Sequence, residues 1–318
     1  MINTMKIIEL AEIKELLHEV NLIPKLEEGF VAYSLGNTVM PPVGELCFTN
    51  PPGDVHIKYG YINGDEFYVV KIASGFYENP KLNLPSSQGL ILLFNQKTGG
   101  LQAILLDEGY LTDLRTAVAG AVVAKYLAPR TVNRIGIVGT GTQARLQLYF
   151  LQQIVSCKDV TVWGRSWAKL LAFQNQMQNE NCRIEITQSM DMLTDSCNLI
   201  VTTTPSSAPI LFANQIREGT HITAIGADTA LKQELDENIF SVAELIITDS
   251  ITQSIERGDT AHALRKKIIA KTQLIELGTI IGGLKKGRTS DKQITVADLT
   301  GLAVQDLQIA KAVYEKAG

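Results

Sequence analysis

From Arg134 onward, short apolar segments alternate with stretches in which apolar residues recur at helical spacing. The apolar segments are residues 135–138, 160–163, 184–187, 199–203, 222–225 and 245–248. Strands at this spacing, with helices between them, are typical of a parallel sheet covered by helices on both faces. The pattern therefore predicts an α/β fold with a doubly wound, Rossmann-type parallel sheet in this part of the chain.

Before residue 130 the pattern has a different character. Strand-like runs at 55–62, 67–72, 90–95 and 103–107 are separated by Gly and Pro clusters, which are turn signals between antiparallel strands. A strand and an amphipathic helix are predicted at the N-terminus, and a helix is predicted over 111–127. The last segment, 295–316, has the helical period again.

The length of 318 residues is about twice that of a usual domain, which favours two domains. We expect an α+β domain at 1–128, completed by 295–318, and the Rossmann-type domain at 129–294. Lys and Arg (29) against Asp and Glu (33) give a net charge of −4, which makes nucleic acid an unexpected partner. The longest apolar run, Ala117–Ala124, is too short to cross a membrane.

The four cysteines lie far apart, with no CxxC and no His at metal-ligand spacing. We therefore predict no metal site and free, mostly buried thiols, as in a reducing compartment. The N-terminus carries acids among its apolar residues and does not resemble a signal peptide. These features together favour a soluble cytoplasmic protein.

A glycine-rich loop follows the first strand of the Rossmann-type part and opens a helix. It comprises Gly139, Thr140, Gly141, Thr142, Gln143 and Ala144. The first Gly allows a tight turn, the second lets the backbone approach a pyrophosphate, and the Ala lets helix and strand pack closely. A glycine turn without a ligand is the alternative, but the βα units that follow favour a dinucleotide site made by these six residues, with Thr203 at the end of a later strand.

The residues after the second strand of this part suggest which dinucleotide binds. NAD-selective sites usually have an acid there, whereas this strand is followed by Gly164-Arg165-Ser166. A guanidinium and a hydroxyl suit a 2′-phosphate, because Arg can pair with it bidentately. We therefore predict NADP (NADPH) in preference to NAD, with Arg165 and Ser166 as ligands; a solvated surface Arg165 is the alternative.

Two cations interrupt apolar patterns in the first domain. Lys71 lies within the strand 67–72, and Arg115 lies on the apolar stripe of the helix 111–127. A buried cation without a partner is costly, so a shared anionic ligand such as a substrate carboxylate is predicted; the alternative is that each reaches water through its aliphatic stem. If the anion is external, removing either cation should not destabilise the fold.

Asp228 follows the strand 222–225, and carboxyl ends of strands in such sheets face the ligand crevice. Its carboxylate could relay a proton or could cap the next helix, and its position does not distinguish these roles.

Several segments together resemble one family. Gly109 to Ala121 resembles the signature helix of the ornithine cyclodeaminase/mu-crystallin family, and the resemblance continues through 139–144, 225–228 with Glu234-Leu235, and 301–306. It covers almost the whole chain. It implies a dinucleotide-binding domain inserted into a substrate and dimerisation domain, and hence a homodimer.

The resemblance also implies roles for single residues. It assigns Lys71 and Arg115 to the substrate carboxylate, Asp228 to acid/base chemistry, and Thr300 and Gly301 to the neighbourhood of the nicotinamide. Lys71 is also a candidate catalytic residue.

The chain departs from the family pattern in one place. Gly44 or Glu45 stands where many members have a carboxylate-binding Arg, and His56 aligns with an acid that contacts the substrate amine. His56 and Lys58 share one face of a strand, so Lys58 could replace the Arg, or both could face solvent.

The function that follows is the NAD(P)H-dependent reduction of a cyclic 2-imino acid, such as Δ1-pyrroline-2-carboxylate to L-proline. The alternatives are ornithine cyclodeaminase, alanine dehydrogenase or opine-type reductive amination, and a crystallin-type binder with little turnover.

Overall fold

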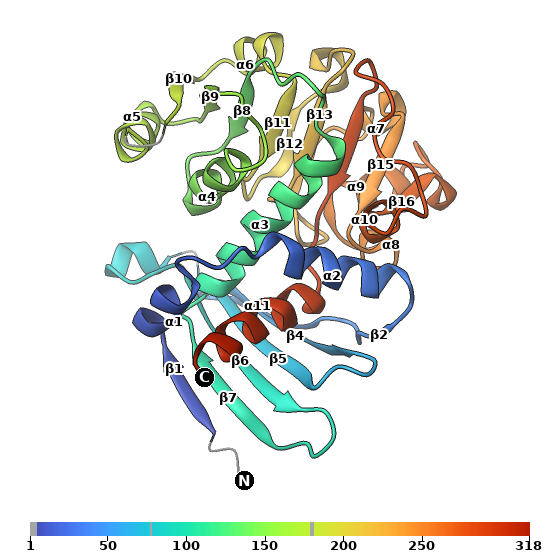
Figure 1. The fold of residues 1–318 in the computed structure, drawn as a ribbon. Coiled ribbons are helices and arrows are strands. Elements are labelled where there is room, and N and C mark those ends of the chain that lie inside the picture. The colour runs from blue at the N-terminus through green and yellow to red at the C-terminus, as the bar shows by residue number, and fades with distance from the viewer. Residues whose placement is uncertain (1–4, 77, 179–180) are drawn as a thin grey trace. The chain divides into compact units, whose positions relative to one another are not determined.

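The computed structural model describes residues 5–76, 78–178 and 181–318, and its chain divides into two compact units (Figure 1). One unit comprises Met1–Arg115 and Leu302–Gly318, and the other comprises Thr116–Gly301. The expected boundaries, 128/129 and 294/295, differ from these. The first division falls inside helix α3 (Tyr110–Leu127), and the second follows strand β17 (Thr295–Asp298).

The first unit contains a mixed sheet. Within the described residues its strand order is β1-β7-β6-β5-β4-β2, and β3 also pairs with β4. The pairing of β1 with β7 is parallel and the others are antiparallel. The strands are β1 (Lys6–Glu9), β2 (Thr38–Val39), β3 (Gly44–Thr49), β4 (Pro52–Ile62), β5 (Phe67–Phe76), β6 (Ser87–Asn95) and β7 (Leu101–Leu106).

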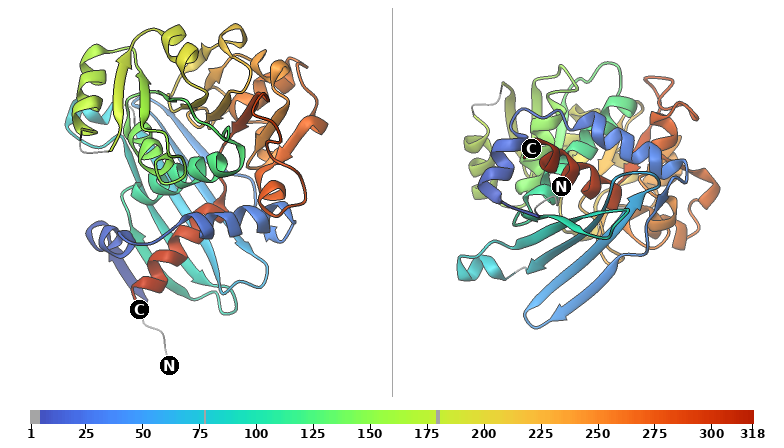
Figure 2. Two further views of the ribbon diagram at one scale, coloured as in Figure 1. Left: turned by 45° about the horizontal axis from the view of Figure 1, so that its top comes forward. Right: turned by 60° about the horizontal axis from the view of Figure 1, so that its bottom comes forward.

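Three helices pack on one face of this sheet: α1 (Leu10–Leu17), α2 (Ile23–Ser34) and α11 (Ala303–Lys316) (Figure 2). The chain-terminal helix α11 contacts α2, β4 and β5, and its residues from Ala303 to Ala310 are all buried. The helices approach closely, because a Cβ atom at Gly29 of α2 would lie 3.2 Å from Gln308. The residues of α11 are therefore core residues of the first unit.

The second unit is built on a parallel sheet. Among the described residues its order is β10-β9-β8-β11-β13-β17-β15-β16, and β12 and β14 form a separate parallel pair. The strands are β8 (Ile135–Val138), β9 (Asp159–Trp163), β10 (Arg183–Thr187), β11 (Leu199–Thr202), β12 (Ser207–Leu211), β13 (His221–Ala224), β14 (Gln233–Leu235), β15 (Leu245–Thr248), β16 (Leu274–Glu276) and β17. The helices are α4 (Thr142–Leu151), α5 (Trp167–Gln176), α6 (Met190–Ser196), α7 (Ile239–Val242), α8 (Ile251–Ser254), α9 (Gly258–Arg265) and α10 (Leu277–Ile281), with the second part of α3.

The predicted α/β, doubly wound fold is confirmed. Every residue of the central strands β8, β11, β13 and β17 is buried, whereas exposed positions alternate along the edge strand β10. A parallel sheet covered on both faces requires such continuous burial. Strand order reverses between β8 and β11, and ligands bind beyond the carboxyl ends of strands at this kind of switch point.

Two predictions about local structure are wrong. The segment 295–316 is not one helix: β17 occupies its start, and α11 begins only at Ala303. The cysteines are free, but they are not mostly buried: Cys197 is buried, Cys47 is exposed, and Cys157 and Cys182 are intermediate.

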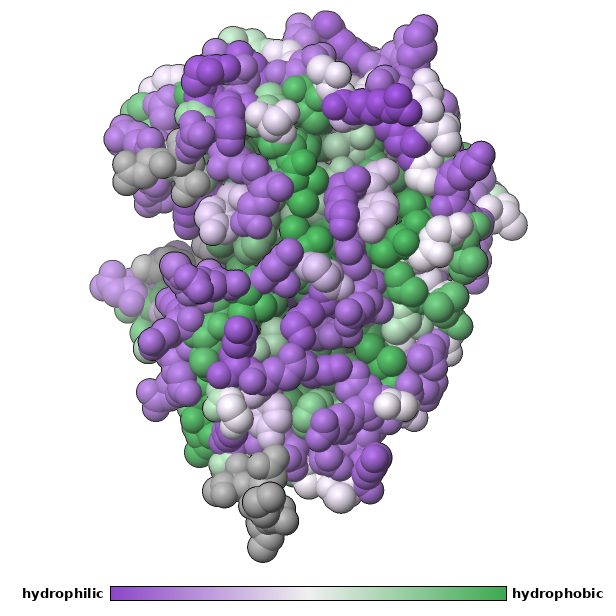
Figure 3. Space-filling model, in the orientation of Figure 1, coloured by the Kyte–Doolittle hydropathy of each residue, from purple (hydrophilic) through white to green (hydrophobic). Residues whose placement is uncertain are grey.

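The surface is mainly polar on the face seen in Figure 3, where hydrophobic residues are interspersed among hydrophilic ones. No helix in the described ranges combines the length and the apolar character that a bilayer crossing needs.

Candidate active site

The loop between β8 and α4 has the open backbone that a pyrophosphate requires. Gly139 has a φ of +126°, and a Cβ atom there would lie 2.5 Å from the Thr203 hydroxyl. At Gly141 a Cβ atom would meet nothing within 4 Å, so open space borders the loop backbone. Ala144 is buried in the core between α4 and the sheet, which allows close packing. The loop thus leaves room for a ligand on one side and packs tightly on the other.

Helix α4 begins at this loop without a side-chain cap. Its N-cap is Gly141, and Thr142 and Gln143 lie in its first turn. The Arg145 guanidinium donates to the Thr140 carbonyl at 3.4 Å and to Thr142 Oγ1 at 3.3 Å, which braces the loop. Uncapped N–H groups and the positive end of the helix dipole attract phosphate oxygens. The residues present therefore fit the pyrophosphate of a dinucleotide.

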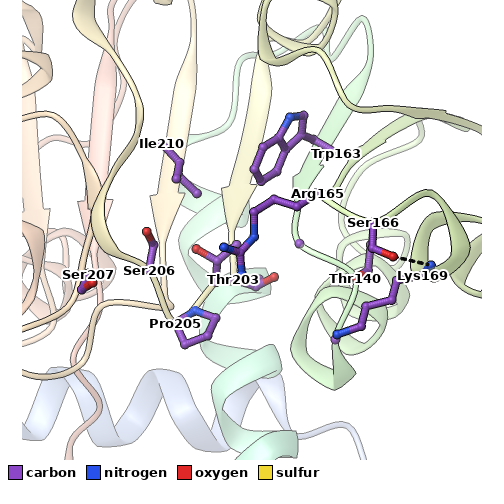
Figure 4. A pocket seen from close by; sticks show the side chains of 14 residues that line it. Thr140, Trp163, Arg165, Ser166, Lys169, Thr203, Pro205, Ser206, Ser207 and Ile210 are labelled. Atoms are coloured by element: carbon purple, nitrogen blue, oxygen red, sulfur yellow. Dashed lines mark hydrogen bonds between the residues drawn. The ribbon is translucent and has the colours of Figure 1, made fainter.

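A pocket of about 600 Å³ adjoins the loop (Figure 4). Its lining comprises Gly139–Gly141, Trp163–Ser166, Lys169, Thr203–Ser207 and Ile210, with no Asp or Glu among them. The Arg165 side chain projects into the pocket, and Lys169 extends beside Ser166. Ser166 also caps α5, because its hydroxyl accepts a hydrogen bond from the Lys169 amide at 3.5 Å. Lys169 and Trp163 also line the pocket, and neither was predicted from the sequence to do so.

Lys71 and Arg115 meet at a buried carboxylate in the first unit. Lys71 Nζ lies 3.0 Å from Asp306 Oδ1, and Arg115 Nε lies 3.1 Å from the same oxygen. Arg115 also donates to Gln305 Oε1 at 2.8 Å. The side chains of Lys71 and Asp306 are 2% and 0% exposed. Neither cation reaches water through its stem, so that alternative is excluded for both.

The presence of Asp306 changes what we expect for the stability of variants that lack Lys71 or Arg115. The two cations already share an internal anion, so removing one of them would leave a buried carboxylate short of a partner. The expectation that such a variant would keep its stability is therefore reversed. Burial raises the pKa of Asp306, but the charges of Lys71 and Arg115 outweigh burial and bring it below its usual value.

Further charged groups surround this cluster. Lys58 is 7% exposed and lies directly opposite Lys71 in the register of β4 and β5, so it does not face solvent. Burial lowers the pKa of Lys71 to about 8, although Asp306 acts in the opposite direction. Asp107 Oδ2 accepts from the Leu111 amide at 2.8 Å, and burial raises the pKa of this carboxyl group. Lys58, Lys71 and Arg115 thus act on Asp306, whose pKa is lowered, and Lys71 also acts on Asp107, whose pKa is raised.

His56 lies two residues from Lys58 on β4 and pairs with Glu45. His56 Nε2 lies 3.0 Å from Glu45 Oε1, and the two residues are partners in the register of β3 and β4. The His56 side chain is only 12% exposed. An acid therefore stands beside His56, although it comes from the neighbouring strand.

Asp228 lies between β13 and β14. Its Oδ1 accepts a hydrogen bond from Lys232 Nζ at 2.7 Å, and its side chain is 39% exposed. The next element is the strand β14, so the alternative that Asp228 caps the following helix is excluded. A partly exposed carboxylate beyond the carboxyl end of β13 can exchange a proton with a ligand.

Thr300 and Gly301 follow β17 and do not line the pocket of Figure 4. Asp249, which follows β15, binds both: its carboxylate accepts from the Thr300 hydroxyl at 3.0 Å and from the Gly301 amide at 2.6 Å. Thr300 is 2% exposed, and Gly301 has a φ of +81°. Asp249 was not predicted from the sequence, and neither were Asp306, Gln305 and Lys169.

The whole chain matches one family model. Residues 3–318 match that of the ornithine cyclodeaminase/mu-crystallin family. The chain belongs to this family. The resemblance inferred from the sequence motifs is thereby confirmed.

Similar proteins cover nearly the full length. An uncharacterised cyclodeaminase of Sinorhizobium fredii is 38% identical over 99% of this chain and 96% of its own. An archaeal alanine dehydrogenase dimer with bound NAD is 34% identical, with a TM-score of 0.90 over 98% of this chain and 96% of its own. Thermococcus litoralis Δ1-pyrroline-2-carboxylate reductase in complex with NADH and L-proline is 28% identical, with a TM-score of 0.92 over 98% and 97%. An iminosuccinate reductase is also among the relatives.

Proposed function

We propose that this protein is an NADPH-dependent reductase of a cyclic 2-imino acid, with Δ1-pyrroline-2-carboxylate as substrate and L-proline as product. The observation that carries the proposal is the buried cation cluster of Lys58, Lys71 and Arg115 in a chain that also has a dinucleotide pocket. The relatives that reduce imino acids or bind L-proline support it.

The cation cluster suits a carboxylate ligand. Among the described contacts, Arg115 uses Nε and one terminal nitrogen, and Lys71 uses one ammonium proton. A guanidinium has five N–H donors and an ammonium has three, so donors remain for a further anion. Lys58 adds a third positive charge. Lys71 and Arg115 would hold the substrate carboxylate, with Lys58 in the place of the Arg that the family pattern leads us to expect.

Asp228 would supply the proton. Reduction of the C=N bond adds a hydride to carbon and a proton to nitrogen, and the bound reduced dinucleotide supplies the hydride. The partly exposed Asp228 carboxyl group would protonate the imine nitrogen. Asp228→Asn is expected to lower kcat about 10²–10⁴-fold while the Kd for NADPH stays the same. A near-normal kcat would contradict the proton role.

The pocket lining supports NADPH as the preferred cofactor. Arg165, Ser166 and Lys169 bring two cations and a hydroxyl to one side of a pocket without an acid. NAD is possible, since the archaeal alanine dehydrogenase and the T. litoralis reductase bind NAD and NADH. We also expect a homodimer, as the alanine dehydrogenase is, and light scattering after size exclusion would test this.

A substrate panel tests the function. NADPH and NADH oxidation would be followed with Δ1-pyrroline-2-carboxylate, its six-membered-ring analogue, and pyruvate with ammonia. The proposal expects oxidation with the cyclic imino acids. Oxidation with pyruvate and ammonia alone would instead identify an amino acid dehydrogenase.

One observation favours a second candidate, ornithine cyclodeaminase. Glu45 of β3 brings a carboxylate beside His56 of β4, and His56 occupies the position where the family pattern has an amine-binding acid. Ornithine with NAD is therefore added to the panel. Ammonia release without net change in the cofactor, lost in Glu45→Gln, would select the lyase.

A further inference from the structure

Glu234 is a buried carboxylate that joins two loops of the second unit. It is 0% exposed, and its oxygens accept four hydrogen bonds. Oε1 accepts from the Thr204 amide at 2.5 Å and from the Thr204 hydroxyl at 2.7 Å. Oε2 accepts from the Gly226 amide at 2.7 Å and from the Thr202 hydroxyl at 2.8 Å. One oxygen thus holds the loop after β11, and the other holds the loop after β13 together with the end of β11.

The two loops are in contact through their backbones at this point. A Cβ atom at Gly226 would lie 2.1 Å from the Thr204 carbonyl oxygen and 2.5 Å from the Thr204 nitrogen. Only a glycine permits this approach. The backbone of Glu234 is held by Asp259, because Asp259 Oδ1 accepts from the Glu234 and Leu235 amides at 2.8 and 2.9 Å.

Each loop carries a part of the proposed chemistry. Thr203 and Thr204 line the dinucleotide pocket. The Thr203 hydroxyl donates to the carbonyl of Val138, which directly precedes the glycine-rich loop at 139–144. Gly226 is two residues from Asp228. A continuous set of contacts therefore runs from Gly139 through Thr203–Thr204 and Glu234 to the 226–228 segment.

We propose that Glu234 is a positioning residue that couples occupancy of the dinucleotide pocket to the order of the 226–228 segment, and so places Asp228. The proposal rests on the proposed function for the role of Asp228. The coupling itself is a property of one unit and can be measured without substrate.

An isosteric substitution tests this coupling. Glu234→Gln keeps the shape but must direct its NH₂ group at the Thr204 amide or at the Gly226 amide, so that one donor faces another. One of the two loops is then released. The matched control is Glu237→Gln, because Glu237 accepts from Gln233 and Lys266 and its side chain has no hydrogen bond to either loop among the described residues.

The first experiment is hydrogen–deuterium exchange of a peptide that covers 225–235, with and without saturating NADPH, or NADH if it binds more tightly. In the wild type and in Glu237→Gln, the cofactor is expected to slow exchange at 226–228 by roughly fivefold or more. In Glu234→Gln the slowing should fall below about twofold although the cofactor Kd changes less than about threefold. Equal slowing in Glu234→Gln, or no slowing in the wild type, would overturn the proposal.

The second experiment measures kcat with the best panel substrate in a double-mutant cycle with Asp228→Asn. Glu234→Gln should lower kcat about tenfold in the wild-type background and less than about twofold in the Asp228→Asn background. Equal factors in both backgrounds would show that Glu234 does not act through Asp228. A failure of the proposed function is seen separately, as a normal kcat in Asp228→Asn or as no turnover in the panel.

If Glu234→Gln does not fold, Thr202→Val replaces it. This change removes only the hydroxyl that donates to Oε2, on a fully buried strand residue. The cofactor-dependent slowing at 226–228 should then fall by about half, and unchanged slowing would count against the proposal.

Discussion

Asp306 in the first unit and Asp298 in the second are equally buried, at 0% and 1% exposure, yet their pKa values move in opposite directions. Asp306 faces Lys71 and Arg115, and these charges overcome burial and lower its pKa. Asp298 accepts from the Thr260 amide at 2.7 Å and faces the Asp249 and Asp259 carboxylates. Burial and the Asp249 charge raise the pKa of Asp298 to about 7, despite the hydrogen bonds from Thr260.

The difference shows two ways to keep an acid inside a protein. In the first unit the pKa of a buried carboxyl group is lowered because cations accompany it, and in the proposed function the same cations bind the substrate carboxylate. In the second unit the carboxylates of Glu234, Asp259 and Asp298 are held by N–H donors, and burial raises the pKa of each. The first arrangement suits ligand binding, and the second suits the fixing of loops.

The largest effect is expected from breaking the ion cluster. Arg115→Ala leaves Asp306 with fewer partners and should lower the free energy of unfolding by about 3–5 kcal/mol, measured by denaturant titration. In an Asp306→Asn background the same substitution should cost much less. Equal losses in the two backgrounds would show that Asp306 is not the partner whose charge matters.

The next effect concerns pH and the second unit. Because the folded pKa of Asp298 is about 7 and the unfolded value is about 4, the folded state keeps a proton that the unfolded chain releases between these values. The free energy of unfolding should therefore fall as pH rises from 4 to 7, by at most about 1.4 kcal/mol per pH unit. Asp298→Asn should flatten this slope in denaturant titrations, and an unchanged slope would assign it to other groups.

A third effect is the dependence of kcat/KM on the charge of Lys71 at alkaline pH. The pKa of Lys71 is about 8, so the cation is lost as pH rises above that value. If Lys71 binds the substrate carboxylate, kcat/KM should fall up to about tenfold per pH unit above pH 8. Arg does not lose its proton in this range, so Lys71→Arg should remove the falling limb. A limb that persists in Lys71→Arg belongs to another group.

The smallest effect is expected at exposed cations. Arg165→Ala should raise the KM for NADPH about tenfold and leave that for NADH nearly unchanged, because a charge-assisted pair with the 2′-phosphate is lost. Lys169→Ala should also raise the KM for NADPH more than the KM for NADH, but by less than Arg165→Ala does. Equal changes with both cofactors would contradict the NADP assignment.

The six predicted strands of the second unit were recognisable because most of their residues are apolar, whereas β12, β14 and β16 were not predicted. Strands such as β8 and β11 are also buried along their whole length. β17 was missed because Thr295 and Asp298 are polar, and only the hydrogen bonds to its surroundings explain their burial. The spacing of apolar residues in a sequence cannot reveal a polar residue that is buried because it has hydrogen-bond partners in the fold.

Some of the candidate site residues were recognisable in the sequence. Lys71 and Arg115 stood out because they interrupt apolar patterns. The glycine-rich loop at 139–144 stood out because the spacing of its glycines and its position between a strand and a helix are specific. Asp306 lies within the family motif 301–306, but no role was predicted for it, since a single acid on a helix resembles a solvated position. Its role depends on residues 235 and 191 positions away, and such pairings are set only by the tertiary fold.

The division of the first unit between two ends of the chain has a consequence for synthesis. Lys71 and Arg115 leave the ribosome long before Asp306, which follows Lys71 by 235 residues. At translation rates of about 5–20 residues per second, the cations wait roughly 10–50 s for their anion. During this interval the nascent sheet lacks α11, and Lys71 and Arg115 lack the Asp306 carboxylate. Helix α11 therefore completes both the core and the ion cluster of the first unit.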